Sequence, residues 1–211
     1  MKHSKKDIGM KKVIALILTL SFAMAQAQTF RGDEIFRIKD SNVYWAAVKT
    51  SYFREFVARQ EEDCWCWAAC VQMVLNYQGV DVDQEDVVRR AKGMRINEGG
   101  TAYDIKRAAD GWHTGSHVIA ARIDNPYNVT AQTFIDDLID KYPLIIGLSM
   151  PGQTMGHAYV LTGISFRKSG KTYQPIEVIL RNPWPSSPSR EKLSWSEFRR
   201  RIHTIVHVYP K

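Results

Sequence analysis

Hydrophobic and polar residues alternate with a helical spacing in the first half of this chain. Asp83, Thr101 and Thr130 are side chains that cap helix starts, and each stands directly before such a segment. Gly79 and Gly93 follow two of the segments and favour their termination. Four helices are therefore expected, over residues 66–77, 84–92, 102–109 and 131–140.

The pattern changes after Pro143. Short runs rich in β-branched residues, separated by Gly, Pro or polar residues, are typical of strands. These runs cover residues 144–148, 157–164, 176–181 and 202–209, with a short helix over 196–201 before the last. Helices followed by antiparallel strands predict an α+β domain of two lobes.

The first residues have the features of a cleavable signal peptide. Five lysines precede an apolar run, Val13 to Met24, that is too short to span a bilayer. Ala25-Gln26-Ala27 then fits a signal-peptidase site. We therefore divide the chain into a signal peptide (1–27), an N-terminal extension (28–59) and one domain (60–211). Export to the periplasm or the extracellular space, without a stable membrane anchor, is expected.

Charge and composition exclude one class of partner. The chain has 211 residues, 45% of them hydrophobic, which suits a single domain with a real core. Its formal net charge of +7 falls to +3 once five Lys and one Asp leave with the signal peptide. Arg199-Arg200-Arg201 is the one basic run that remains, and we interpret it as a solvated face. No nucleic-acid motif accompanies it, so nucleic acid is not expected as a partner.

The three cysteines, Cys64, Cys66 and Cys70, fall within seven residues. In an exported protein cysteines usually pair at distant positions, and this cluster cannot staple a fold in that way. A zinc site would need a wider gap between paired ligands and a second pair, which the sequence lacks. Cys70 fits a small core residue on a helix. Three roles are open for Cys64: packing, a disulfide bridge to Cys70, and protection of Cys66 from oxidation.

Cys66 stands where the first helix begins, and a helix start favours the reactive thiolate. The segment from Gln60 through Cys66-Trp67-Ala68-Ala69 resembles the nucleophile region of papain-like cysteine proteases. In that family a glutamine six residues before the nucleophile helps to bind the oxyanion. The resemblance implies Cys66 as nucleophile and Gln60 as an oxyanion donor.

Three further segments match the same family in the same order. Gly156-His157 resembles its catalytic histidine, and Asn182-Pro183-Trp184 its third catalytic residue with the tryptophan that covers it. Gly99-Gly100 is similar to the glycine pair that holds substrate backbone, although a plain turn explains it equally well. The resemblance implies His157 as general base, Asn182 as its orienting partner, and Gly99, Gly100 and Trp184 as substrate-binding residues.

The sequence also departs from the plant enzymes. Cys64-Trp65 replaces the usual Gly-Ser pair, and the gaps from Cys66 to His157 and Asn182 are shorter than the roughly 130–150 residues of papain. The chain resembles instead the compact bacterial branch that includes staphopains and type III effector proteases.

The function expected from these residues is secreted, thiol-dependent endopeptidase activity through a Cys66-His157-Asn182 triad and a thioester intermediate. The substrate is a protein or peptide, and neither a metal nor an organic cofactor is needed. Acyl transfer or isopeptide cleavage on the same fold, and a catalytically silent binding module, are the alternatives.

The signal peptide gives a direct prediction. Cleavage after Ala27 should leave Gln28 as the first residue of the exported protein, because the small residues at positions 25 and 27 define the site. N-terminal sequencing of exported material checks this. Material that still contains the Val13 to Met24 run would contradict it.

Overall fold

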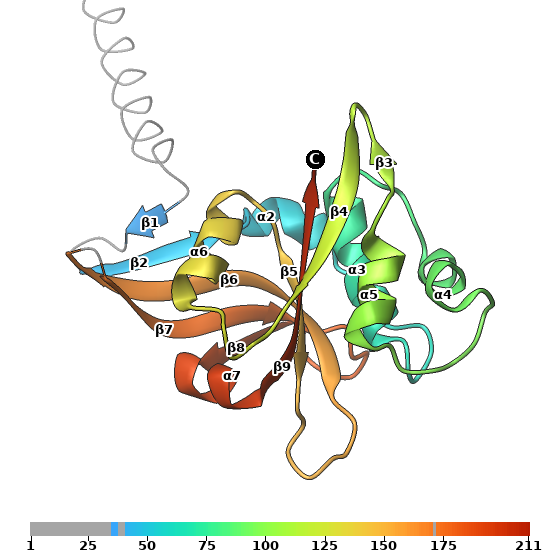
Figure 1. Ribbon diagram of the computed structural model, residues 1–211. Coiled ribbons are helices and arrows are strands. Elements are labelled where there is room, and N and C mark those ends of the chain that lie inside the picture. The colour runs from blue at the N-terminus through green and yellow to red at the C-terminus, as the bar shows by residue number, and fades with distance from the viewer. Residues whose placement is uncertain (1–34, 38–40, 171) are drawn as a thin grey trace, which may run out of the picture.

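The computed structural model describes residues 35–37, 41–170 and 172–211, and the predicted signal peptide lies outside them. Figure 1 shows a twisted sheet with α3, α4 and α5 gathered on one side of the molecule and α7 below the strands. The helices are α2 (Thr50–Phe53), the 3-10 helix η1 (Arg54–Phe56), α3 (Cys66–Tyr77), α4 (Gln84–Lys92), α5 (Ala102–Ala109), α6 (Ala131–Ile139) and α7 (Trp195–Arg201).

The strands described in the structure form one antiparallel sheet around a long central strand. They are β1 (Ile35–Arg37), β2 (Val43–Ala47), β3 (His113–Thr114), β4 (His117–Asp124), β5 (Leu144–Leu148), β6 (His157–Ser169), β7 (Thr172–Arg181), β8 (Arg190–Ser194) and β9 (Ile202–Pro210). Their order is β1-β2-β6-β5-β9-β4-β3, and β7 pairs with both β6 and β8. Strand β6 therefore has partners on both edges, which makes its position in the fold well determined.

Local capping explains why the first helices start where they do. The Asp83 carboxylate accepts a hydrogen bond from the Asp86 N–H at 2.7 Å, and Gly93 ends α4 with a φ of 80°. Thr101 and Asp104 form a reciprocal capping box at the start of α5. Thr130 occupies the N-cap of α6, but its side chain makes no capping hydrogen bond, so that detail of the prediction was wrong.

The predicted α+β class is confirmed, and most predicted elements match closely. The helix over 66–77 and the strand over 144–148 agree with α3 and β5 residue by residue. The predicted strands do not include β1, β2, β3, β4 or β8. Strand β4 contains His117-Val-Ile-Ala-Ala-Arg, and the two alanines have low strand propensity. Pairing with β9 decides its conformation, and that partner lies far along the chain.

The end of the predicted N-terminal extension is integrated into this domain. Strand β2 pairs with β6, from Val43 opposite Arg167 to Ala47 opposite Gly163. Phe53 in α2 has no exposed surface, and its ring centroid lies 5.1 Å from that of Tyr77 in α3. Among the described residues, no helix has the length and apolar composition needed to cross a membrane.

This packing predicts that the extension contributes to stability. Phe53→Ala should lower the free energy of unfolding by about 3–5 kcal/mol, because it removes a fully buried ring and leaves a cavity. Tyr52→Ala, in the same helix, is the matched control: Tyr52 is 47% exposed, so about 1 kcal/mol is expected. Urea denaturation of the mature protein measures both values. Equal effects would contradict integration of Phe53 into the core.

Candidate active site

A cleft with a volume of about 500 Å³ lies where the start of α3 meets the start of β6. It is bordered by the glycine pair 99–100, the β5–β6 loop and the start of β9. Its lining includes Cys66, His157, Asn182, Gly99, Gly100 and Trp184. The structure thus brings together six of the seven residues that the sequence suggested for the site.

Cys66 is the first residue of α3 and is partly buried. The backbone N–H groups of Ala158 in β6 and of Trp67 in α3 act on its sulfur. Burial raises the pKa of the Cys66 thiol, and these N–H groups oppose that rise because they favour the thiolate. The nearby Cys64 thiol adds to the rise. The helix start therefore supports the thiolate without fully offsetting its loss of solvation.

His157 is the first residue of β6 and precedes Ala158, whose N–H lowers the pKa of the Cys66 thiol. Its Nε2 lies 2.8 Å from Asn182 Oδ1, so Nδ1 is the ring nitrogen left for the thiol. Burial lowers the pKa of His157, while the Asn182 hydrogen bond and the charge of Glu191 oppose that change. Burial of both partners therefore favours the neutral thiol and neutral imidazole over an ion pair.

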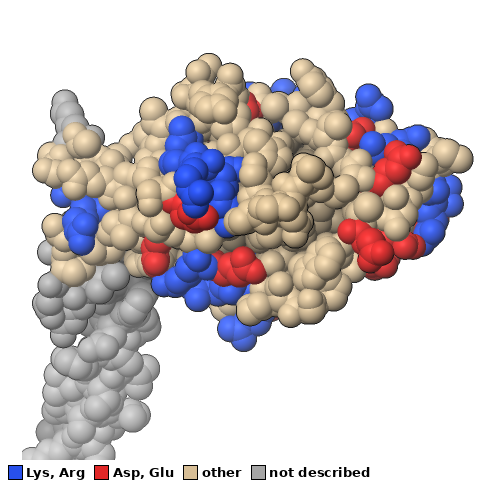
Figure 2. All heavy atoms as spheres, turned by 90° about the horizontal axis from the view of Figure 1, so that it is seen from below, with Lys and Arg blue, Asp and Glu red and all other residues tan. Residues whose placement is uncertain are grey.

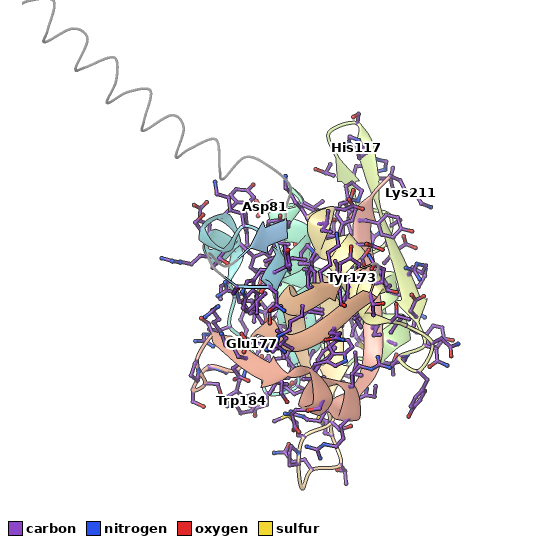
Figure 3. All side chains as sticks on the ribbon, turned by 90° about the vertical axis from the view of Figure 1, so that its left-hand side faces the viewer. Asp81, His117, Tyr173, Glu177, Trp184 and Lys211 are labelled. Carbon is purple, nitrogen blue, oxygen red and sulfur yellow. The ribbon has the colours of Figure 1, made fainter. Side chains whose placement is uncertain are left out.

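Asn182 is held from several directions and is only 4% exposed. Its Oδ1 also accepts the Trp184 N–H at 2.8 Å, and its Nδ2 donates to Glu191 Oε1 at 2.5 Å. The Trp184 ring stands edge-on to the His157 ring, with centroids 5.9 Å apart, and is 40% exposed. Figure 3 shows Trp184 at the lower end of the molecule, where the β5–β6 loop also lies, and His117 at the opposite end.

Arg59 fastens this segment to the chain that leads into α3. Its Nη1 donates to the carbonyls of Asn182 and Trp184, at 3.0 and 2.7 Å. The Gln60 N–H donates to the Pro183 carbonyl at 2.9 Å. These bonds join residues more than 120 positions apart and set Asn182 relative to Cys66.

Gln60 is the predicted site residue that does not line the cleft. Its Nε2 donates to the carbonyls of Glu62 and Asp63, at 3.0 and 2.9 Å, which uses both amide hydrogens. Its Oε1 is buried without a hydrogen-bond partner. In this arrangement Gln60 fixes the turn that precedes α3, and neither amide hydrogen is left for an oxyanion.

The glycine pair is held in place by two buried tryptophans of the nucleophile segment. Trp65 and Trp67 donate their indole N–H groups to the carbonyls of Ile96 and Glu98, at 2.8 and 3.0 Å. A Cβ atom at Gly100 would lie 2.4 Å from the Trp67 ring. Only glycine fits at position 100. Because glycine has no side chain, its main chain borders the cleft directly.

The other two cysteines differ from one another. Cys70 is fully buried in the core, as predicted, and burial raises its pKa well above the ordinary value. Cys64 is partly exposed, lines the cleft and has its N–H bonded to Asn97 Oδ1 at 3.0 Å. All three cysteines are free thiols. Within the part of the chain that the structure describes, no cluster of three or more His, Cys, Asp and Glu could hold a metal ion.

Several residues of the site carried no recognisable signal in the sequence. His203 lines the cleft and packs on glycines: a Cβ at Gly156 would lie 2.4 Å from its Nε2. Arg201, interpreted as part of a solvated run, donates instead to the Ser149 carbonyl at 2.9 Å and supports the β5–β6 loop. Glu191 lies in β8, where partly buried and exposed residues alternate, and it is one of the partly buried residues.

Residues 54–207 match the Peptidase_C39 like family. No curated protein sequence matches the chain. The peptidase domain of Streptococcus ComA, a bi-functional ABC transporter involved in a quorum sensing pathway, is 19% identical and has a TM-score of 0.52; the match covers 73% of this chain and 97% of that one.

A double glycine motif protease from an AMS/PCAT transporter, solved with its leader peptide, is 21% identical, with a TM-score of 0.46. That match covers 74% of this chain and 91% of the other. At such identity the ComA likeness concerns the fold, which is the papain-like mixture of helices and antiparallel sheet. The family match spans most of the chain. The chain therefore belongs to the Peptidase_C39 like family and is a cysteine-type peptidase.

Proposed function

We propose that this protein is an exported endopeptidase in which Cys66, His157 and Asn182 form the catalytic triad. The observation that carries the proposal is the 2.8 Å contact between His157 Nε2 and Asn182 Oδ1 in the cleft that Cys66 also lines. It leaves Nδ1 as the nitrogen that can take the thiol proton. The resemblance to staphopains and type III effector proteases stays a prediction, as does the boundary of the domain at Gln60.

The reaction needs the Cys66 sulfur as a thiolate and His157 as the group that takes its proton. As the peptide enters the cleft, His157 Nδ1 takes the thiol proton and the Cys66 sulfur attacks the substrate carbonyl. His157 then donates that proton to the leaving amine, and a thioester remains on Cys66. Water, deprotonated by His157, attacks the thioester and releases the acid product. Asn182 holds the ring in one orientation throughout.

The developing oxyanion needs hydrogen-bond donors near the Cys66 sulfur. The backbone N–H of Cys66 is one, since it lies close enough to that sulfur to lower its pKa. Gln60 is the second donor that the family resemblance implies. It can act only if substrate binding frees one amide hydrogen from the Glu62 or Asp63 carbonyl.

A peptide is the substrate that the cleft suits best. Gly99 and Gly100 leave space for extended backbone, and Met150, Met155 and Trp184 provide apolar contact. Among the described residues of the lining, Asp63 is the only Asp, Glu, Lys or Arg. The view from below shows mainly uncharged residues in the middle of the face (Figure 2). An uncharged, partly apolar peptide segment is therefore the proposed ligand.

Substitution of the three cysteines tests the nucleophile. Cys66→Ala should reduce peptide hydrolysis on the order of 10⁶-fold, because no other group can form the thioester. Cys64→Ala and Cys70→Ala are the matched controls and should keep a measurable fraction of kcat. Peptide cleavage followed by mass spectrometry measures all three, and it also distinguishes hydrolysis from acyl transfer to an amine.

Two results would overturn this assignment. Hydrolysis that survives in Cys66→Ala would remove Cys66 as nucleophile. If the parent protein hydrolyses no peptide and its Cys66 is not labelled by an electrophilic epoxide, the protein is a silent binding module.

The third catalytic position gives a graded prediction. His157→Ala should lower kcat/KM on the order of 10⁴-fold, Asn182→Ala about 10–100-fold, and Trp184→Ala by less. Asn182 raises the pKa of His157, so its removal lowers that pKa and keeps the imidazole neutral in more acidic solution. The acid limb of the kcat/KM profile should therefore move to lower pH in Asn182→Ala. Wild-type rates in both Asn182→Ala and Trp184→Ala would mean that another residue orients the ring.

A further inference from the structure

Glu191 takes part in a chain of hydrogen bonds that ends at the catalytic histidine. Asn182 Oδ1 lies 2.8 Å from His157 Nε2, and Asn182 Nδ2 donates to Glu191 Oε1 at 2.5 Å. Glu191 does not line the cleft, so it reaches His157 only through this amide. In the described part of the chain, Glu191 forms no salt bridge, and the amide is its hydrogen-bond partner.

The carboxylate decides how the Asn182 amide is oriented. An ionised carboxylate only accepts hydrogen bonds, so the NH₂ end of the amide must face Glu191. Oδ1 then faces His157 and the Trp184 N–H, which donates to it at 2.8 Å. Since Oδ1 only accepts, the proton of the neutral imidazole must sit on Nε2. Nδ1 is left as the unprotonated nitrogen, which is the one that the reaction needs as base.

Glu191 also brings a negative charge near the imidazole. Its charge raises the pKa of His157, against the effect of burial. The other ionisable groups around the ring are Cys66 from α3, Asp63 before α3, Tyr159 from β6, His203 from β9, and the cations Arg59 and Arg201. Arg59 bonds the backbone carbonyl of Asn182, whereas Glu191 bonds its side-chain amide, which is the group that contacts His157. Asn182 is neutral, so the triad itself contains no carboxylate.

We propose that Glu191 is a positioning residue for the peptidase reaction: it fixes the Asn182 amide, and through it the tautomer of His157, and supplies the negative charge that the triad lacks. This inference rests on the proposed function of the same site. It makes Glu191 the fourth member of a Cys66–His157–Asn182–Glu191 series, in which the last residue acts without contact with the substrate.

Titration of His157 by NMR tests the charge independently of peptidase activity. In a Cys66→Ala background, which removes the coupled thiol, Glu191→Gln should lower the titration midpoint of His157, because the charge that favours the imidazolium is gone. Glu177→Gln is the matched control: Glu177 lies in the same sheet and is paired with Lys192 at 2.7 Å. It should leave the midpoint unchanged. An unchanged midpoint in Glu191→Gln would overturn the proposal.

Moving the carboxylate tests the pairing with Asn182. Asn182→Asp alone sets two carboxylates against one another, whereas Asn182→Asp combined with Glu191→Gln restores one carboxylate and one amide. The double variant should therefore exceed Asn182→Asp in kcat/KM by about tenfold. Glu191→Gln alone should lower kcat/KM about tenfold relative to the parent. A glutamine side chain both donates and accepts hydrogen bonds, so it no longer selects one orientation of the Asn182 amide.

The two measurements separate the inference from the proposed function. If the parent hydrolyses no peptide, the function fails, and the NMR titration still decides whether Glu191 acts on His157. If the parent is active but the double variant is no faster than Asn182→Asp, the hydrogen bond between residues 182 and 191 does not support the reaction. That result overturns the proposal. Glu191→Gln keeps the size and shape of the side chain, and its urea denaturation midpoint, expected within error of the parent, excludes a folding defect.

Discussion

The start of helix α3 rests against the start of strand β6, and this contact sets the two reacting groups beside one another. Cys66 is the first residue of the helix, His157 is the first residue of the strand, and the Ala158 N–H lowers the pKa of the Cys66 thiol. Helix α3 buries eight side chains, and it packs on both β5 and β6. Because β6 is paired along both edges, neither partner of the contact can shift alone.

The remaining parts of the cleft are attached to this contact through backbone carbonyls. Trp65 and Trp67 bind the loop that carries Gly99 and Gly100, and Arg59 binds the segment that carries Asn182. Such bonds fix the position of main chain without depending on the side chains of the residues they hold. The cleft can therefore vary in its side chains while its geometry is kept.

Burial and charge act in opposite directions within the site. Low exposure raises the pKa of the thiol and lowers that of the imidazole, which disfavours both charged forms. Backbone N–H groups at the helix start, the Asn182 amide and the Glu191 carboxylate each favour the charged forms. The groups that stabilise the ions are therefore already in place for the reaction.

The sequence alone determined what depends on neighbouring residues. Helix α3, strand β5 and the caps at Asp83 and Thr101 follow from local spacing, and the resemblance around Cys66, His157 and Asn182 named three residues that the fold brings into one cleft. The tertiary structure decided the placement of His203 in the cleft and the contact of Glu191 with Asn182. Their contacts join segments that no periodic pattern links, because a polar side chain has many candidate partners in the sequence. Only the pairing of β8 with β7 and of β9 with β5 brings such partners together.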